Sequence, residues 1–516
     1  MEARDRVVGW LGPAAVALLA LGLRVWHLGR PNLLVFDETY YAKDAYSLLQ
    51  HGYVQDFVSD ANEKIVDGVL TGLTNGQPAY IAHPDGGKWL IAVGEAIFGM
   101  NSFGWRISAA VVGALTVLVL ARLVLRLTGS VWVGCLAGLL LCLDGLHFVM
   151  SRTALLDVFL TFWVVAGVAC LVADRDAVRA RLDAYVRWRP WQLAAGVCFG
   201  MAVGTKWSGL YVLAAFGVVV VVWEVLARRT HARTHAADRA SDEGASPAPR
   251  FGWVRTTLAT GLPAFGYLVL VALVVYLLTW TGFLLHQEAY AVRYGLGDPS
   301  WGSYVSSPTP GFLGGVLDAF RSLWHFHVMV FDFHTGSYLA GKTHPYASNP
   351  AGWLLLERPV AFDAQFKLPA TACGAPEGST CIREVTALGN PAVWWPAAVA
   401  VVAAVVAWVR TRDGRWAVPV VGVAAGWLPW FGSTDRPIFS FYAVLVVPFM
   451  IVALCLLVDE ARRWADTAQR RYAVGLGVGL LVVAVVVCFW YFLPIWTDRT
   501  IPYDAWLDRM WFRRWI

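Results

Sequence analysis

The chain has 516 residues, of which 58% are hydrophobic and 15% are charged, and its formal net charge is +5. Soluble domains carry about 25% charged residues, so this composition excludes an ordinary soluble protein and predicts that lipid surrounds most of the chain. The small net charge gives no indication of a nucleic-acid partner.

Apolar runs of about 20 residues, long enough to cross a bilayer, recur along the chain. They predict an all-α integral membrane protein, a single polytopic domain over residues 1–516 with about eleven transmembrane helices, because an open sheet cannot satisfy its backbone in lipid. The first run lacks a small-residue cleavage site, so we expect it to be retained as a span. The runs are 7–27, 104–125, 130–147, 153–173, 191–205, 207–227, 256–284, 392–409, 416–431, 438–458 and 473–493.

Lys and Arg are concentrated in alternate loops, which the positive-inside rule places in the cytoplasm. The N-terminus is then expected in the cytoplasm and the C-terminus outside the cell membrane. One of these loops, 228–255, is expected to be a disordered cytoplasmic linker, because residues 230–250 are rich in Ala, Ser, Pro and charge. The other cytoplasmic loops are 174–190, 410–415 and 459–472.

Two large loops are predicted on the extracytoplasmic side. The first, 28–103, contains a surface helix at 38–50 and an apolar run at 88–99 that is too short to span and is expected in the interface. The second loop covers residues 286–391 and carries Cys373 and Cys381. A disulfide persists in that compartment, so we expect the two cysteines to be bridged.

The first loop opens with the acidic pair Asp37 and Glu38, directly after Phe36. Adjacent carboxylates beside lipid are costly to ionise without partners. On a helix they point about 100° apart, so only one of them is expected to face a given site. The pair either supplies a general base at the membrane surface or has a purely structural role, in which its negative charge stabilises a helix N-terminus.

Basic residues and glycines follow in the same loop. In HPDGGKW, from His83 to Lys88 and Trp89, the glycines allow close approach of a ligand, and Gly-Gly-Lys could receive an anion. Arg106 lies at the outer end of the second span, where it either reaches up to lipid head groups or holds a phosphate.

The stretch DGLHFVMSRTALLD places Asp157 about one and a half turns inside a predicted span, with Arg152 as its expected partner. This pair is either functional or a structural link between helices, and the sequence leaves both open. Lys206 and Arg436 lie in tight outer turns, and His344 lies in the second loop. The histidines lack the spacing of a zinc site, so we expect no protein metal site.

Taken together, these carboxylates and cations share one side of the membrane. This arrangement suits a lipid-linked phosphate whose head group emerges at the outer leaflet. The cations would stabilise the departing phosphate, and a carboxylate would deprotonate the incoming nucleophile.

At this point the sequence resembles the protein O-mannosyltransferases, membrane enzymes of the C-type glycosyltransferase (GT-C) class in glycosyltransferase family 39, and most closely the bacterial branch. Six pieces carry the resemblance in family order. They are FDE at 36–38, HPDGGKW at 83–89, WR at 105–106, SRTALLD at 151–157, HPYASNPAGW from His344 and RPIFSFY from Arg436.

The resemblance implies an inverting transfer of mannose from polyprenyl-phosphate-mannose to Ser or Thr hydroxyls of secreted proteins. It implies Asp37 as the base, Glu38 as a supporting acid or acceptor contact, and Arg436 as a ligand of the lipid phosphate. The predicted substrate-binding residues are His83, Lys88, Arg106, Arg152, Asp157, Lys206, His344 and Arg436. No cofactor is expected, and the sequence leaves a divalent metal open.

Two departures from the family pattern stand out. Asp85 occupies the position of the family's usual second proline. Residues 286–391 are also too few for the sugar-binding-like domain of eukaryotic relatives. Association with the secretion translocon is a further family expectation.

Two other functions compete with this one. One is another polyprenyl-phosphate-sugar transferase that acts on a glycan or lipid acceptor. The other is a transporter, which would predict an internal repeat and charges at mid-membrane. The sequence shows no such repeat and carries its charges mainly at one face.

Overall fold

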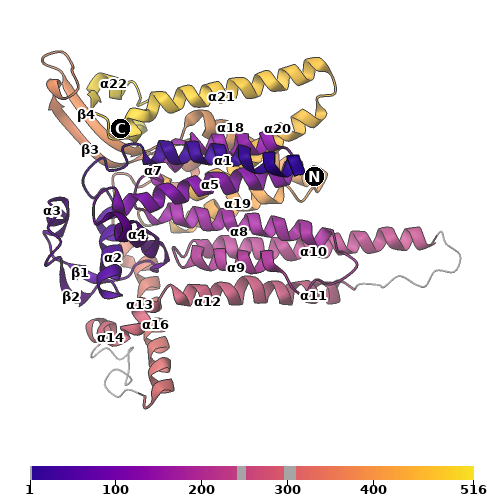
Figure 1. Cartoon of the computed structure of the whole chain (residues 1–516), viewed down its shortest axis with the longest axis horizontal. Helices are drawn as coiled ribbons and strands as arrows, with labels where there is room; N and C mark the ends of the chain where they lie inside the picture. Colours follow the sequence, from indigo (N-terminus) through magenta and orange to yellow (C-terminus); the bar gives the residue numbers. More distant parts are fainter. Residues whose placement is uncertain (1–2, 241–251, 296–308) are drawn as a thin grey trace.

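The computed structural model describes residues 3–240, 252–295 and 309–516, and it is dominated by a bundle of long helices (Figure 1). Each predicted apolar run is largely helical. Within the described residues, seven helices are long and apolar enough to cross a membrane and three further apolar helices are shorter, so the total of eleven spans stays a prediction. The bundle helices are α1 (Ala3–Val25), α5 (Gly104–Thr128), α6 (Val131–Cys142), α8 (Leu156–Arg179), α9 (Pro190–Val203), α10 (Gly209–Ala240), α11 (Trp253–Phe265), α12 (Val271–Leu278), α18 (Pro391–Thr411), α19 (Ala417–Trp427), α20 (Val447–Trp464) and α21 (Ala468–Trp496).

Small residues let α9 closely approach the helical segment that runs from α11 to α12. A Cβ on Gly196 would meet the carbonyl oxygen of Tyr267 at 2.0 Å, in the π-helical turn η1 (Gly266–Leu270) that joins α11 to α12. A Cβ on Gly200 would meet the carbonyl oxygen of Ala272 at 2.8 Å. Membrane helices associate through such small-residue contacts. This packing fixes the end of α9, where Lys206 follows.

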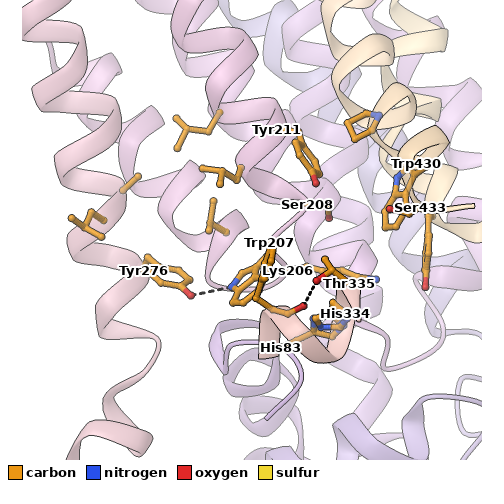
Figure 2. Close-up of a pocket in the computed structure, with 18 of the residues that line it drawn as sticks. His83, Lys206, Trp207, Ser208, Tyr211, Tyr276, His334, Thr335, Trp430 and Ser433 are labelled. Atoms are coloured by element: carbon orange, nitrogen blue, oxygen red, sulfur yellow. Dashed lines mark hydrogen bonds between the residues drawn. The ribbon is translucent and has the colours of Figure 1, made fainter. Parts of the chain in front are cut away.

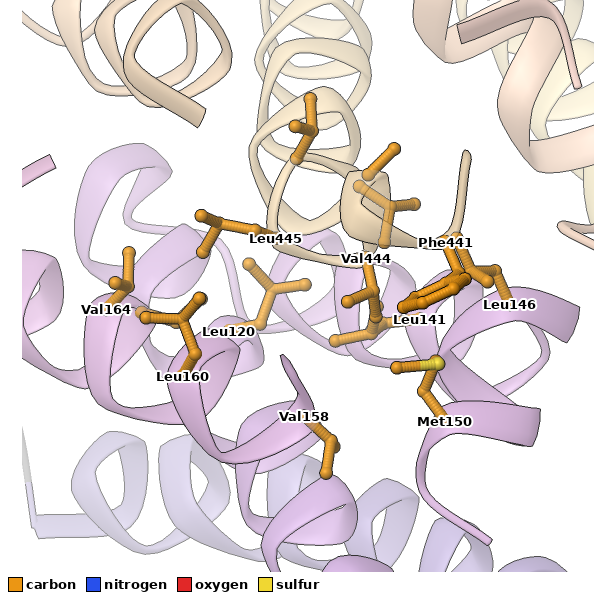
Figure 3. Packing of buried hydrophobic residues seen from close by; sticks show 14 of the residues in the cluster. Leu120, Leu141, Leu146, Met150, Val158, Leu160, Val164, Phe441, Val444 and Leu445 are labelled. Atoms are coloured by element: carbon orange, nitrogen blue, oxygen red, sulfur yellow. The ribbon is translucent and has the colours of Figure 1, made fainter. Parts of the chain in front are cut away.

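Apolar packing also joins the C-terminal half to the N-terminal half. Leu120 on α5 and Leu160 on α8 lie in the same buried cluster as Val444 and Leu445 of the 3₁₀ segment η5 (Ser440–Leu445), which leads into α20 (Figure 3). The cluster therefore holds η5 against the helices that carry the predicted site residues.

Both large loops and the C-terminus gather at one end of the bundle, which we call the site end (Figure 1). The first loop contains α2 (Glu38–His51), α3 (Ala61–Val66) and α4 (Gly86–Phe98), so the surface helix predicted at 38–50 and the run at 88–99 are both helical. Trp89, Val93 and Ile97 of α4 are exposed, as suits a helix in the interface.

Strands outside the bundle were not predicted. In the first loop β1 (Gln55–Phe57) pairs antiparallel with β2 (Thr74–Pro78). In the second, β3 (Val360–Pro369) pairs antiparallel with β4 (Thr380–Ala387), and β5 (Ile501–Pro502), which follows α21, adds a third antiparallel strand beside β4. Beyond the bundle, water and neighbouring strands can satisfy the backbone, so sheet is allowed there. The hairpin of β3 and β4 carries a disulfide between Cys373 and Cys381.

The second loop also contains helices. They are α14 (Gln287–Gly295), α16 (Phe312–Thr335) and α17 (Ser337–Ala340), and α13 (Thr281–Leu285) directly precedes the loop. The 24-residue α16 runs across the direction of the bundle at the site end (Figure 1). Its exposed side is apolar and includes Phe312, Trp324 and Phe331. Because polar residues interrupt the apolar ones along the sequence, a search for continuous apolar runs does not detect this helix.

The predicted linker 228–255 is only partly described. Helix α10 continues to Ala240, so the first part of this segment is helical and the disorder predicted there is wrong. Residues 241–251 lie outside the described part of the chain, and α11 begins at Trp253.

Candidate active site

The turn that carries the acidic pair is anchored on both sides. Phe36, which has a left-handed φ of 47°, stacks on Phe362 of β3 with ring centroids 4.9 Å apart. Its ring also meets Phe439 and Phe441 edge-on, at 6.0 and 5.6 Å. These contacts connect the first loop to β3 and η5 immediately before Asp37.

Glu38 anchors the other side of the turn. Its carboxylate is fully buried and accepts two hydrogen bonds from Arg106, each 2.8 Å long. The backbone N–H groups of Val35 and Ala154 donate to the same carboxylate at 3.0 and 2.9 Å. Both oxygens are therefore engaged by the protein, and Glu38 positions the turn and does not face an acceptor here. The Arg106 guanidinium also donates to the carbonyl groups of Leu28, Pro31 and Leu33.

Asp37, between these anchors, has a carboxylate without a hydrogen bond or ion pair to the described residues. Burial raises the pKa of Asp37 to about 6, against the opposing effect of the positive charge on Lys206, and the negative charge of Asp157 adds to the rise. A carboxylate poised near neutral pH with free oxygens is suited to act as a general base.

Asp157 pairs with Lys206, whose Nζ lies 2.9 and 3.1 Å from the two carboxylate oxygens. The predicted Arg152–Asp157 pair is wrong. Asp157 lies in the first turn of α8 and not deeper in the span, because the helix begins only at Leu156. Burial alone would lower the pKa of Lys206, but Asp157, Tyr442 and Asp37 raise it above its usual range. Lys206 Nζ also lies 4.4 Å from the centroid of the Tyr442 ring.

Arg152 has a different role. Its guanidinium donates to backbone carbonyl groups at the site end of α1, so it holds that end in place and does not face the site. These acceptors are Arg24 at 2.7 Å, Trp26 at 2.7 Å and His27 at 3.2 Å.

Lys88 is also paired with carboxylates of the protein itself. It is 1% exposed, and its Nζ is 3.0 Å from Asp85 and 3.1 Å from Asp44 of α2. The Gly-Gly-Lys segment instead packs tightly, since a Cβ on Gly86 would meet the carbonyl oxygen of Gly204 at 2.7 Å. Asp85, the departure from the family pattern, thus pairs with the loop's own lysine.

A cavity of about 600 Å³ opens beside the Asp157–Lys206 pair. One part of its wall is apolar and comes from α10, η1, α12 and the end of α16. The other part is polar and aromatic, and Figure 2 shows these side chains converging from separate elements. The residues of this part are His83, Lys206, Trp207, Ser208, Tyr211, Tyr276, His334, Thr335, Trp430, Ser433, Arg436 and Tyr442.

Arg436 is a free cation on this wall. Its guanidinium has no hydrogen bond or ion pair among the residues that the structure describes, whereas Lys206 is neutralised by Asp157. His83 stacks on His334 with ring centroids 5.4 Å apart. Burial, and then the charge of Lys206, lower the pKa of His83, so it is neutral at pH 7. An anion in the cavity therefore meets its positive charge at Arg436.

His344 lies near this group but does not line the cavity. Its ring meets Phe439 edge-on at 5.0 Å, and its Nδ1 accepts the backbone N–H of Tyr346 at 3.2 Å. The structure thus brings Asp37, Asp157, Lys206, His83 and Arg436 to one region. It leaves Lys88, Arg106 and Arg152 in supporting positions.

Sequence reasoning missed several cavity residues. Trp207 donates from its indole N–H to the Tyr276 hydroxyl at 3.0 Å, and Tyr442 lies under Lys206. Aromatic residues are frequent at the ends of spans, so their sequence positions alone carry no signal. Over the described residues no group of three or more His, Cys, Asp or Glu could hold a metal ion.

Comparison of the sequence with models of known protein families identifies the family of this chain. The family described as dolichyl-phosphate-mannose-protein mannosyltransferase matches residues 14–290. The C-terminal four-helix region of protein O-mannosyltransferases matches residues 319–515. The chain belongs to the protein O-mannosyltransferase family. The predicted resemblance is confirmed, and the two matches together span most of the chain.

Bacterial relatives match over nearly the full length. The polyprenol-phosphate-mannose–protein mannosyltransferase of Mycobacterium tuberculosis is 35% identical, with 99% of this chain and 92% of the relative aligned. The enzyme of the same name from Corynebacterium glutamicum is 29% identical over 97% of this chain and 92% of its own length.

A solved family structure shows the same fold. The Saccharomyces cerevisiae protein O-mannosyltransferase Pmt1–Pmt2 complex, bound to its sugar donor, superimposes with a TM-score of 0.69 at 14% identity. The match covers 100% of this chain and 93% of the yeast chain. The predicted helical GT-C membrane fold is confirmed, and the chain is a multi-pass membrane protein.

Proposed function

We propose that the chain transfers mannose from polyprenyl-phosphate-mannose to Ser or Thr hydroxyls of proteins. One observation carries the proposal: Arg436 lines a cavity with an apolar wall and Asp37 lies close to Lys206 of the same wall, and neither side chain has a hydrogen bond or ion pair among the described residues. Such a cavity suits a lipid-linked sugar, since its apolar wall accepts the prenyl chain and its polar wall accepts phosphate and sugar. The names of the bacterial relatives support this donor and acceptor.

In this proposal Asp37 takes the proton of the acceptor hydroxyl as its oxygen attacks the anomeric carbon. The phosphate leaves from the opposite face, so configuration inverts. Arg436 stabilises the negative charge on the leaving phosphate, which needs no protonation by an acid. The Asp157–Lys206 pair holds positive and negative charge beside Asp37, and Glu38 and Arg106 keep its turn fixed.

We place the site end and the C-terminus outside the cell membrane, and the N-terminus in the cytoplasm, as the positive-inside pattern supports. The acceptors are then proteins that have crossed the membrane. Delivery by the secretion translocon is part of the same proposal.

The test uses the purified full-length protein in liposomes with labelled polyprenyl-phosphate-mannose. Label is expected on a Ser/Thr-rich peptide and not on the same peptide with every Ser and Thr replaced by Ala. Transfer to a glycan or lipid acceptor, with none to the peptide, would contradict the proposal and favour the other polyprenyl-phosphate-sugar transferases.

A further inference from the structure

A second cavity, of about 470 Å³, lies where the chain leaves the site ends of α1 and α21. It shares no lining residue with the first cavity. Three segments far apart in the sequence build its wall: the loop after α1, strand β4 and the loop after α21. The lining residues are Trp26, His27, Arg30, Pro31, Asn32, Arg383, Thr497, Asp498, Arg499 and Thr500.

The charges in this second cavity are unbalanced. Three guanidinium groups, on Arg30, Arg383 and Arg499, line it together with one carboxylate, Asp498. The side chains of Arg30 and Arg499 make no hydrogen bond or ion pair with any residue that the structure describes. The cavity therefore carries net positive charge and unused donors.

The ion pair between Arg383 and Asp498 inside this cavity leaves donors and acceptors unused. Arg383 Nε lies 3.7 Å from Asp498 Oδ1, which is too long for a hydrogen bond. Both atoms are buried without a hydrogen-bond partner, and the Asp498 side chain is 4% exposed. Asp498 thus orients Arg383 without satisfying it. Guanidinium groups match the geometry of phosphate oxygens, so a phosphate would use these free donors.

The position of the second cavity indicates where such a phosphate comes from. Helices α1 and α21 are both long and apolar enough to span the membrane, and the cavity begins at the residues that follow each of them. Trp26, which directly follows α1, is 46% exposed at the rim of the cavity. Exposed tryptophans at span ends mark the head-group level of a bilayer. We propose that this cavity binds the phosphate of a phospholipid head group in the leaflet at the site end.

Bound lipid would brace the loop that leads to the acidic pair. Arg152 holds the carbonyl groups of Trp26 and His27, and Arg106 holds that of Pro31 while pairing with Glu38. The wall of the second cavity and the turn at Asp37 therefore share one hydrogen-bonded framework.

The test is native mass spectrometry of the purified full-length protein titrated with phosphatidylglycerol. The double variant Arg383→Gln/Arg499→Gln is expected to bind this lipid about tenfold more weakly, as loss of hydrogen bonds to a charged group predicts. Arg513→Gln, an exposed arginine near the C-terminus outside both cavities, is the matched control and should bind as the wild type does. Equal binding by the double variant and the wild type would overturn the proposal.

Two further measurements distinguish a phospholipid from free phosphate and from the acceptor peptide as the ligand of the second cavity. Displacement of the lipid by an equal concentration of inorganic phosphate would overturn a lipid as the ligand. A raised KM for acceptor peptide with unchanged lipid binding would make the second cavity an acceptor surface and would also overturn it. If the double variant is not monodisperse, Arg499→Gln alone, at an exposed position, is expected to weaken lipid binding. Lipid binding needs no mannosyl transfer, so its failure leaves the proposed function untouched.

Discussion

At the residue scale, the account depends on the ionisation of Asp37. Its pKa is raised to about 6, chiefly by burial, and a general base must be deprotonated. The rate of transfer, as kcat/KM, should therefore be constant above about pH 7 and fall about tenfold per pH unit below pH 6. A pH profile from 4.5 to 8 measures this. A rate that stays constant down to pH 5 would exclude Asp37 as the base.

The two charged neighbours of Asp37 should shift the pH at which kcat/KM falls, and they should shift it in opposite directions. Lys206 lowers the pKa of Asp37 and Asp157 raises it. In Lys206→Met the fall in kcat/KM should therefore begin at higher pH, and in Asp157→Asn it should begin at lower pH. Both variants lose the same buried ion pair, so a shared loss of stability cannot produce opposite shifts. If kcat/KM falls at the same pH in both variants as in the wild type, the Asp157–Lys206 pair does not act on Asp37.

Residue positions were predicted better than residue partners. The sequence placed Asp157, Arg152 and Lys206 on one side of the membrane but paired Asp157 with the wrong cation. Both cations lie at span ends, and the sequence does not say which of them reaches the carboxylate. Arg152 instead meets the unpaired carbonyl groups at the end of α1, which are invisible in a pattern of side chains.

At the element scale, Glu38 holds the first loop against Arg106 of α5 and against the turn at Ala154 that leads into α8. Glu38→Gln leaves the Arg106 charge buried without its counterion, which should cost about 3–5 kcal/mol of stability. Thermal unfolding in detergent should show a lower midpoint together with reduced transfer. The double variant Glu38→Leu/Arg106→Met removes the unbalanced charge but leaves the carbonyl groups of Leu28, Pro31 and Leu33 without their donor, so it should recover only part of the stability and none of the transfer. A Glu38→Gln protein as stable as the wild type would remove the proposed positioning role.

The helices of the bundle could be predicted because long apolar runs have one solution in lipid. The helix α16 and the β3–β4 hairpin could not. Polar residues such as Asp318 and Arg321 interrupt the apolar residues of α16, and its amphipathic pattern has no continuous run. The cavity wall formed by Phe331, His334 and Thr335 at the end of α16 was missed for the same reason.

At the scale of the whole molecule, the orientation can be tested by labelling. The 29-residue α21 carries Arg471 near its start and leads to Arg513 beyond its end, so these two exposed positions lie at opposite ends of the bundle. An impermeant maleimide added to intact cells should label Arg513→Cys. It should label Arg471→Cys only after permeabilisation. The reverse pattern would place the site in the cytoplasm.

The most direct test of the central claim is mannosyl transfer by Asp37→Asn at matched protein concentration. The variant should lose transfer by a factor of about 100 or more, as removal of a general base predicts, while donor binding is retained. Because the folded-state pKa of Asp37 lies above the ordinary value of 3.8, the ionised group destabilises the fold at neutral pH. The variant should therefore be at least as stable as the wild type, and unfolding would not explain its inactivity. Transfer at the wild-type rate would contradict the account and move the base to another carboxylate.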